Sequence, residues 1–309
     1  MRQLIFWLSY LYVPFLLVCL FVIRTKFGAI RWAAFIALVF TTIIAYARFV
    51  EPRILLVEHS EITLEGAQPD SPAIKIALFA DTHFGIFTHA MPMQRIVYRI
   101  NQEAPDAVMI AGDFLYYLSP LDIPTALAPL ADIQVPIFAV LGNHDVGFPG
   151  PIYTEELYAA LTKLGVIMIE NRAHAMTLAG QDVTIAGISD LWEQQQDFSF
   201  STDLTDGPIF LLTHNPDTAF KVPASIDYDL MLAGHTHGGQ IRIPGLYKKV
   251  IPTEYPFDKG LYRLPFGART RLVFVTTGTG MVGLPFRFNM LPRIDILTVS
   301  VPNASVGIR

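Results

Sequence analysis

Cysteine is almost absent from this chain of 309 residues, and charged side chains are scarce. The single cysteine, Cys19, cannot form an internal disulfide and offers no thiolate cluster for zinc, so any metal must be bound by His, Asp, Glu or Asn. Charged residues make up 16% of the chain, whereas soluble domains contain about 25%. The net charge of -5 gives no overall attraction to a phosphate polymer, so we expect no nucleic-acid partner.

Apolar residues are abundant instead, at 52% of the chain with a mean hydropathy of +0.42. Residues 4–23 carry no charge and are as long as the roughly 20 residues that a helix needs to cross hydrocarbon. Residues 32–47 are also uncharged but shorter, so they span only if the helix begins near Phe27 and Arg31 reaches the headgroups. We therefore expect a two-helix transmembrane hairpin over residues 1–53 and a single domain over residues 54–309.

A cleaved secretory signal is the alternative for the N-terminal segment, because residues 45–47 read Ala-Tyr-Ala, which matches a cleavage site. Two apolar stretches precede that site, and the first is longer than the signal core of about 7 to 15 residues, so retention as an anchor is favoured. The basic flanks do not assign the orientation, because the turn and the outer ends carry equal numbers: Arg24, Lys26 and Arg31 against Arg2, Arg48 and Arg53.

The remaining chain alternates between strand and helix patterns. Apolar, β-branched runs bounded by turn residues predict strands at 54–57, 61–64, 74–80, 107–111, 135–141, 183–188, 209–213, 230–233 and 272–276. Helical patterns lie between several of them, at 93–103 and 154–164. This alternation is typical of an α/β domain in which helices cover a sheet.

Polar blocks with metal-binding side chains follow five of these strands, where ligands gather in α/β sheets. The blocks are Asp81-Thr82-His83, Gly112-Asp113, Gly142-Asn143-His144-Asp145, Thr213-His214-Asn215-Pro216 and Gly234-His235-Thr236-His237-Gly238-Gly239. Each block alone is an ordinary turn or helix cap. Together they would bury many polar groups at a high desolvation cost, so we favour a metal site.

The ordered motifs D-x-H, G-D, G-N-H-D, H-N-P and G-H-T-H-G-G resemble the calcineurin-like metallophosphoesterase superfamily over residues 74–295. The apolar N-terminus, the sequence G-H-T-H-G-G-Q and the tail T-G-T-G-M-V-G-L-P-F-R-F resemble its membrane-associated bacterial branch, which includes phosphodiesterases and a UDP-diacylglucosamine diphosphatase of lipid A synthesis. The resemblance implies a four-layer αββα sandwich after the hairpin. It also implies an integral protein of the bacterial inner membrane, with the side of the catalytic domain unassigned.

The same resemblance implies two divalent metal ions, with Mn, Fe and Zn all compatible with the ligands. One ion would be held by Asp81, His83 and His237, the other by Asn143, His214 and His235, and Asp113 would bridge them. His144 would stabilise the transition state or protonate the leaving oxygen.

Two further catalytic candidates have alternatives that the sequence leaves open. Asp145 orients His144 or caps the following segment. Arg287 pairs with a substrate phosphate or forms a surface salt bridge. Two positions depart from the family pattern: residues 114–117 are apolar and aromatic where many relatives continue with an acid, and Arg293 follows proline where relatives often carry Glu.

Basic and aromatic residues are interleaved between positions 242 and 271, with seven basic residues against two acidic ones. Such a segment is typical of a lipid headgroup surface, and also of single-stranded nucleic-acid platforms; the hairpin favours the lipid bilayer as partner. We therefore expect a phosphohydrolase acting on a phosphodiester or diphosphate of a lipid-linked substrate such as UDP-diacylglucosamine. A nuclease, a cyclic-nucleotide phosphodiesterase and a scaffold without turnover are the alternatives, and the oligomeric state is not assigned.

Overall fold

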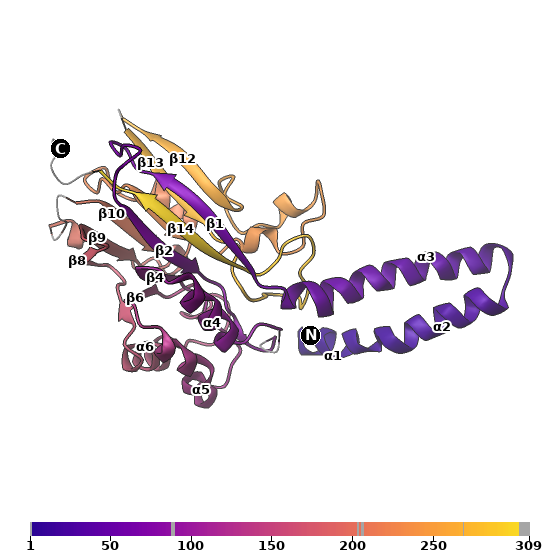
Figure 1. Ribbon diagram of the computed structural model, residues 1–309. Coiled ribbons are helices and arrows are strands. Elements are labelled where there is room, and N and C mark those ends of the chain that lie inside the picture. The colour runs from indigo at the N-terminus through magenta and orange to yellow at the C-terminus, as the bar shows by residue number, and fades with distance from the viewer. Residues whose placement is uncertain (1, 88–89, 203, 205–206, 268, 303–309) are drawn as a thin grey trace.

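The computed structural model describes residues 2–87, 90–202, 204, 207–267 and 269–302. A pair of long N-terminal helices projects from one end of a domain built around two β-sheets (Figure 1). The described C-terminal strand runs back through the middle of the domain, so its sheet combines strands from both ends of the chain.

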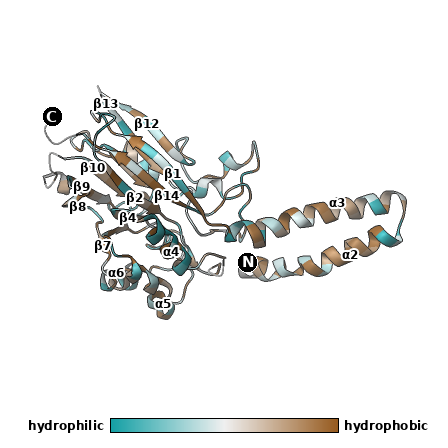
Figure 2. Cartoon of the chain, viewed as in Figure 1, coloured by the Kyte–Doolittle hydropathy of each residue, from teal (hydrophilic) through white to brown (hydrophobic). Residues whose placement is uncertain are grey.

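The hairpin consists of three helices: α1 (Arg2–Leu8), α2 (Tyr12–Thr25) and α3 (Gly28–Ala45). Short helical turns join α1 to α2 and extend α3, so that two helical segments, Leu4–Thr25 and Gly28–Arg53, are long and apolar enough to cross a membrane. Both helices are mostly hydrophobic along their length (Figure 2), and many of their large apolar residues are exposed. The second segment is longer than the uncharged stretch because Arg31 and Arg48 lie within it.

The base of the hairpin is fixed to the domain through both of its helices. The Phe6 ring packs on Phe87 with 6.0 Å between the ring centroids. At the other helix, the backbone N–H of Arg287 donates to the Ala47 carbonyl at 2.9 Å. The hairpin is therefore part of the packed structure at its base as well as a projecting pair of helices.

The first sheet has six strands in the order β1-β14-β2-β4-β6-β7. Their bounds are β1 (Leu56–Thr63), β14 (Arg293–Ser300), β2 (Ala73–Phe79), β4 (Ala107–Ala111), β6 (Ile137–Val140) and β7 (Ile167–Met168). Strand β14 is antiparallel to β2, whereas β2, β4, β6 and β7 are mutually parallel.

The second sheet also has six strands, in the order β12-β13-β11-β10-β9-β8. Their bounds are β12 (Gly260–Phe266), β13 (Arg269–Val275), β11 (Leu230–Ala233), β10 (Ile209–Thr213), β9 (Gln181–Ile188) and β8 (Arg172–Leu178). The four central strands are parallel and the two edge strands are antiparallel. A small pair, β3 (Phe84–Gly85) and β5 (Leu115–Tyr116), lies between loops that follow β2 and β4.

Three helices cover the outer face of the first sheet: α4 (Met93–Glu103), α5 (Ile123–Leu127) and α6 (Thr154–Lys163). In α4 the apolar residues recur at helical spacing, and Met93, Ile96 and Ile100 are buried against that sheet. A second apolar core, which includes Phe138 and Phe210, fills the space between the sheets. The predicted α/β fold with two packed sheets is therefore confirmed.

The fourth layer differs from the expected one. In the part of the chain that is described, the outer face of the second sheet is covered by 3-10 helices such as Pro216–Phe220 and by loops. Buried Tyr228 and Phe257 fill this layer. Large aromatic side chains from loops thus cover the outer face of the second sheet, whereas α-helices cover that of the first sheet.

Several edge strands were not recognisable from apolar runs. Residues 54–57 and 61–64 were expected as two strands, but one continuous strand, β1, pairs with β14 through the polar residues between them. The edge strands β8 and β12 were not predicted because they contain charged and polar side chains, as edge strands often do. Strand β14 lies inside its sheet, between β1 and β2, but it also contains charged and polar side chains and was not predicted. In β14 two of these charged residues, Arg293 and Asp295, are buried and form an ion pair.

The basic and aromatic segment from 242 to 271 does not form one continuous surface. Phe257 and Arg271 are buried, and Arg269 pairs with Asp227 and Asp229 near the turn between β12 and β13. Phe257 and Arg271 are therefore not available to a lipid-facing surface, and contact of the other residues of this segment with the bilayer stays a prediction.

We predict that Glu51→Ala destabilises the domain. Glu51 is buried at the end of the hairpin, and its Oε1 accepts a hydrogen bond from the backbone N–H of Met290. Loss of a buried acceptor costs about 1–3 kcal/mol of unfolding free energy, which reversible urea unfolding of the full chain in detergent would measure. Glu61→Ala, at an exposed position of β1, is the matched control. Equal stability of both variants would show that this contact does not support the fold.

Candidate metal centre

The predicted site residues come together where the central strands of the two sheets end. Residues after β2, β4 and β6 meet residues after β10 and β11, because the carboxyl ends of these parallel strands share one edge. The gathered side chains are at most 9% exposed: Asp81, His83, Asp113, Asn143, His144, His214, His235 and His237.

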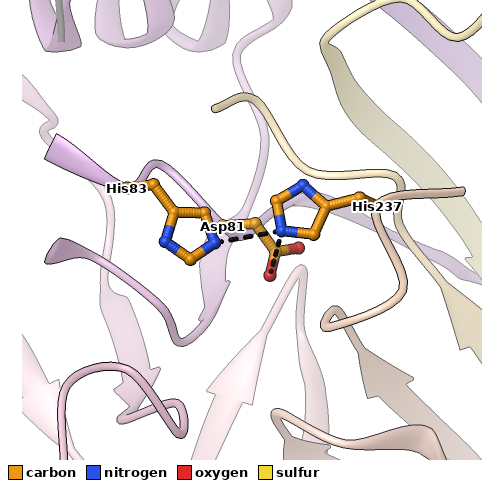
Figure 3. A group of neighbouring side chains, drawn as sticks. All are labelled: Asp81, His83 and His237. Carbon is orange, nitrogen blue, oxygen red and sulfur yellow. Dashed lines mark hydrogen bonds and ion pairs between the residues drawn. The ribbon is translucent and has the colours of Figure 1, made fainter. Parts of the chain in front are cut away.

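One group of ligand atoms is formed by Asp81, His83 and His237, shown in Figure 3. The two histidine Nε2 atoms lie 3.0 Å apart, and His237 Nε2 is 3.6 Å from Asp81 Oδ1. The imidazole rings stack with 4.9 Å between centroids. Two ring nitrogens and a carboxylate oxygen that face one point can hold a single cation.

A second group surrounds His214. Its Nε2 lies 3.1 Å from Asn143 Oδ1, 3.1 Å from His235 Nδ1 and 3.3 Å from Asp113 Oδ2. Ligand atoms of His214, Asp113 and Asp81 also lie within 4.8 Å of one another. This group therefore offers nitrogen and oxygen donors from both sheets.

Asp113 lies between the two groups. Its Oδ2 is 3.5 Å from His83 Nε2 and 3.3 Å from His214 Nε2. Its Oδ1 accepts the backbone N–H of His144 at 2.9 Å. One carboxylate oxygen is therefore held by the backbone while the other faces both groups, which is the arrangement that a bridging carboxylate requires.

Backbone carbonyls orient the histidine rings. His214 Nδ1 lies 2.7 Å from the Ala111 carbonyl oxygen, and His235 Nε2 lies 2.9 Å from that of Pro252. Because a carbonyl only accepts, these nitrogens carry the proton and the opposite ring nitrogen faces the centre.

The turn at Phe148 and Pro149 orients two further side chains. The Asn143 amide nitrogen donates to the Phe148 carbonyl, which directs its oxygen toward His214. His144 Nδ1 lies 2.9 Å from the Pro149 carbonyl oxygen.

Burial dominates the electrostatics of the site. It raises the pKa of Asp81 to about 7 and lowers the pKa values of His83 and His235 to about 3. Burial alone would also raise the pKa of Asp113 and lower that of His214, but attraction between this pair reverses both shifts. The Asp113–His214 pair is surrounded by imidazoles that stay neutral and by the Asp81 carboxyl, whose charged form is unfavourable when buried. A cation bound among these groups would stabilise the charged carboxylates.

The residues fit a divalent metal. Asp81 Oδ2 is buried and has no hydrogen-bond partner among the described residues. An unpaired carboxylate oxygen in a buried position is costly, and a cation would remove that cost. The mixed nitrogen and oxygen donors suit Mn, Fe or Zn.

Several of these residues have a left-handed backbone conformation that side chains other than glycine rarely adopt. The positive φ angles are 54° at Asp81, 46° at His83, 56° at Asp113, 71° at His235 and 50° at His237. Each costs about 1–3 kcal/mol, and such strain concentrates at functional sites where the surrounding structure enforces it.

Residues 74–239 match the family model of the calcineurin-like phosphoesterases. The chain belongs to this family. Together with the buried Asp and His groups, the match makes the protein a metal-dependent phosphoester hydrolase.

Curated relatives share the phosphoesterase assignment. The "Uncharacterized metallophosphoesterase YkuE" of Bacillus subtilis is 29% identical over 270 residues, which are 84% of this chain and 90% of the relative. The "Phosphodiesterase YaeI" of Escherichia coli is 30% identical over 230 residues, 72% of this chain and 81% of the relative. The "Transmembrane protein with metallophosphoesterase domain" of Danio rerio is 29% identical over 292 residues, 87% of this chain and 62% of the relative. With the two apolar helices, the last name indicates a membrane protein.

Arg287 lies in the interior of the protein and not at the surface, where the salt-bridge alternative would have placed it. The side chain is completely buried, and its guanidinium donates to the carbonyls of Thr277, Gly278 and Gly280 at 2.9–3.2 Å. Its Nη2 also lies 3.5 Å from His237 Nδ1. The guanidinium therefore holds a loop and a candidate ligand in place and forms no surface salt bridge among the described residues; its pairing with a substrate phosphate stays a prediction. Burial lowers its pKa to about 10.

Asp145 also differs from both alternatives. Its buried carboxylate accepts the backbone N–H groups of Gly142, Phe114 and Leu115 at 3.0–3.1 Å. It ties the loop after β6 to the loop after β4, whereas the carbonyl of Pro149 is what orients His144. Burial raises the pKa of this carboxyl to about 8.

Two aromatic residues beside the site were missed in the sequence. The Trp192 ring meets His235 edge-on at 4.8 Å, and Tyr116 meets His83 at 5.5 Å and His144 at 5.2 Å. Trp192 comes shortly after the parallel strand β9, and this position at a strand end is what could have predicted its place beside the site. Its backbone N–H donates to the Asp190 carboxylate, which fixes the turn.

We predict that Asp145→Asn destabilises the domain without a specific effect on the protonation of His144. An amide has one acceptor oxygen, whereas the two carboxylate oxygens accept three backbone N–H groups, so unfolding free energy falls by about 1–3 kcal/mol. Denaturant unfolding measures the loss, and Asp182→Asn at an exposed position is the control. If the variant keeps its stability but changes the pH-rate profile, the prediction is wrong and Asp145 orients His144.

Proposed function

We propose that the protein is a membrane-anchored, two-metal phosphohydrolase that cleaves a phosphodiester or diphosphate of a lipid-linked substrate, such as UDP-diacylglucosamine in lipid A synthesis. The observation that carries this proposal is the position of Asp113 Oδ2, within 3.5 Å of both His83 Nε2 and His214 Nε2. A single carboxylate oxygen that faces two separate donor groups is what a pair of divalent ions would share.

The ligands divide into two sets in this proposal. Asp81, His83 and His237 hold one ion, Asn143, His214 and His235 hold the other, and Asp113 contacts both. When bound, divalent ions supply charge stabilisation for the phosphoryl oxygens and lower the pKa of the attacking water. The protein's part is to keep these donors buried, oriented by carbonyls and spaced for both ions.

His144 is the general acid of the proposal. Its backbone and its Nδ1 are held by Asp113 and the Pro149 carbonyl, and its ring lies 5.1 Å from that of His83. The Pro149 carbonyl keeps a proton on Nδ1, so Nε2 is the atom that transfers a proton to the leaving oxygen.

A lipid-linked substrate is supported by where the hairpin meets the domain. Phe6 of α1 packs in one cluster with Tyr116, whose ring contacts His83 and His144. Arg287, which lies against His237, donates its backbone N–H to the carbonyl of Ala47 in the helical turn after α3. The donor groups thus lie near the helices that would cross the bilayer. The two apolar helices are what supports a membrane location, and we propose the bacterial inner membrane.

The substrate class is tested by incubating metal-reconstituted protein with membrane lipid extract, UDP-linked lipid, cyclic nucleotides and single-stranded DNA, and identifying products by mass. We expect lipid phosphates from the lipid substrates. Turnover restricted to nucleic acid or cyclic nucleotides would support the nuclease or cyclic-nucleotide phosphodiesterase, and no turnover of any phosphoester would support a scaffold. Asp113→Asn protein serves as the background control.

We predict that Asp113→Asn abolishes turnover and lowers the metal content from two ions per chain toward one or none. A bridging carboxylate compensates both cations, whereas a neutral amide compensates neither. Elemental analysis of the purified variant after reconstitution and gel filtration measures the stoichiometry. Unchanged metal content with full activity would refute the bridging role.

We predict that His144→Ala retains its metals but loses activity by a factor of about 10² to 10⁴. Leaving groups of high pKa depend most on a proton donor, so an alkyl phosphodiester slows far more than a nitrophenyl phosphodiester. Parallel rate measurements on the two esters make the comparison. If both esters slow equally, His144 is not the general acid and acts by charge stabilisation alone. If the variant loses metal, His144 is one of the metal ligands.

A further inference from the structure

A loop beside the hairpin exposes apolar side chains that the fold does not cover. It comprises residues 242–251, shortly after the candidate ligand His237. Ile243 is 45% exposed, Leu246 56% and Val250 73%. Single exposed apolar residues are ordinary at a protein surface, whereas a group of them on one loop is typical of an interaction surface.

The loop is held in this conformation from inside the domain. The Tyr247 hydroxyl donates to the Asp258 carboxylate at 3.1 Å and accepts from Arg242 Nη2 at 2.7 Å. The Arg242 guanidinium also pairs with Asp258 at 3.0 Å and donates to the Gly238 carbonyl at 3.0 Å. The polar side chains at the base of the loop are thus satisfied within the domain, and the exposed apolar side chains are carried on a fixed support.

The loop begins where the hairpin joins the domain. The backbone N–H of Arg287 donates to the carbonyl of Ala47, near the end of the apolar segment Gly28–Arg53. At the next residue, the carbonyl of Phe288 accepts the backbone N–H of Arg242, the first residue of the loop, at 2.8 Å. The loop, in orange, therefore lies at the end of the domain that carries the hairpin (Figure 1). A bilayer that contains the hairpin would have its surface close to this loop.

The charges of the loop favour an anionic lipid surface as its partner. Lys248 and Lys249 are exposed between Leu246 and Val250, and residues 241–253 include no acid. Apolar side chains next to lysines are typical of segments that enter the headgroup region of anionic bilayers. We propose that this loop docks on the anionic surface of the bilayer that contains the hairpin. The proposal rests on the membrane anchoring of the proposed function and not on its substrate.

This docking surface adjoins the metal centre. Pro252, the residue after the loop, orients His235 through its carbonyl oxygen, which lies 2.9 Å from the ring Nε2. The Gly238 carbonyl that accepts from Arg242 directly follows His237 in the chain. A bilayer docked on the loop therefore lies beside two candidate metal ligands.

The test measures where single fluorescent labels lie on the full-length chain in vesicles of phosphatidylcholine with phosphatidylglycerol. Cys19→Ala removes the only cysteine, and Leu246→Cys or Val250→Cys then carries the label in the loop. Leu17→Cys, exposed on α2, reports on the hairpin, and Asp70→Cys, exposed before β2, is the control. We expect lipid spin-labelled at the headgroup to quench both loop labels but not the label at Asp70, and lipid spin-labelled in the acyl chain to quench the label at Leu17.

The hairpin label separates failure of this inference from failure of the proposed anchoring. Quenching at Leu17 without quenching at Leu246 or Val250 would overturn the docking surface and leave the anchoring intact. No quenching at any of the three would overturn the anchoring and, with it, the docking surface. Loop labels that respond to single-stranded DNA but not to vesicles would refute the lipid surface and indicate a nucleic-acid platform.

The lysines are tested by the double substitution Lys248→Ala and Lys249→Ala. Each lysine removed should lower the ratio of docked to undocked loop about 5-fold in vesicles that contain phosphatidylglycerol. Lys163→Ala, exposed at the end of α6, is the matched control and should leave the quenching of the loop labels unchanged. Equal quenching in the double variant and the unmodified loop would refute recognition of an anionic lipid surface.

Discussion

The structure depends on the burial of polar side chains where two sheets end together. Three carboxylate or amide groups and five imidazoles share a space that water barely enters, and a left-handed backbone is required at several of them. Among the described residues of this centre, the Asp113–His214 pair supplies mutual electrostatic stabilisation. A divalent cation is the group that makes such an arrangement stable, and the same cations are what phosphoester hydrolysis requires.

Arg287 connects this centre to the hairpin. Its side chain holds the 277–280 loop and lies against His237, while its backbone N–H donates to Ala47 in the helical turn after α3. A buried guanidinium that saturates several carbonyls is rigid, so one residue contacts both the base of the hairpin and a candidate ligand. The hairpin is therefore a structural support of the site in addition to a means of attachment.

The sequence predicted the central strands and the helices that flank them because parallel strands are continuous apolar runs and each ends in a recognisable polar block. The inner strand β14 was missed, since its buried charges, Arg293 and Asp295, are compensated by each other and interrupt the apolar pattern. Asp145 and Arg287 were recognised as important but not understood. Their partners are backbone groups from distant loops, and which N–H or carbonyl faces a side chain is decided only by the fold.

The central claim is that two metal ions share Asp113. Electron paramagnetic resonance of the unmodified protein, titrated with Mn²⁺ after removal of its metals, tests this directly because two ions about 3.5–4 Å apart through one carboxylate are magnetically coupled. We expect a coupled spectrum that saturates at two ions per chain. An isolated six-line signal that saturates at one ion would contradict the shared carboxylate and the hydrolytic mechanism built on it.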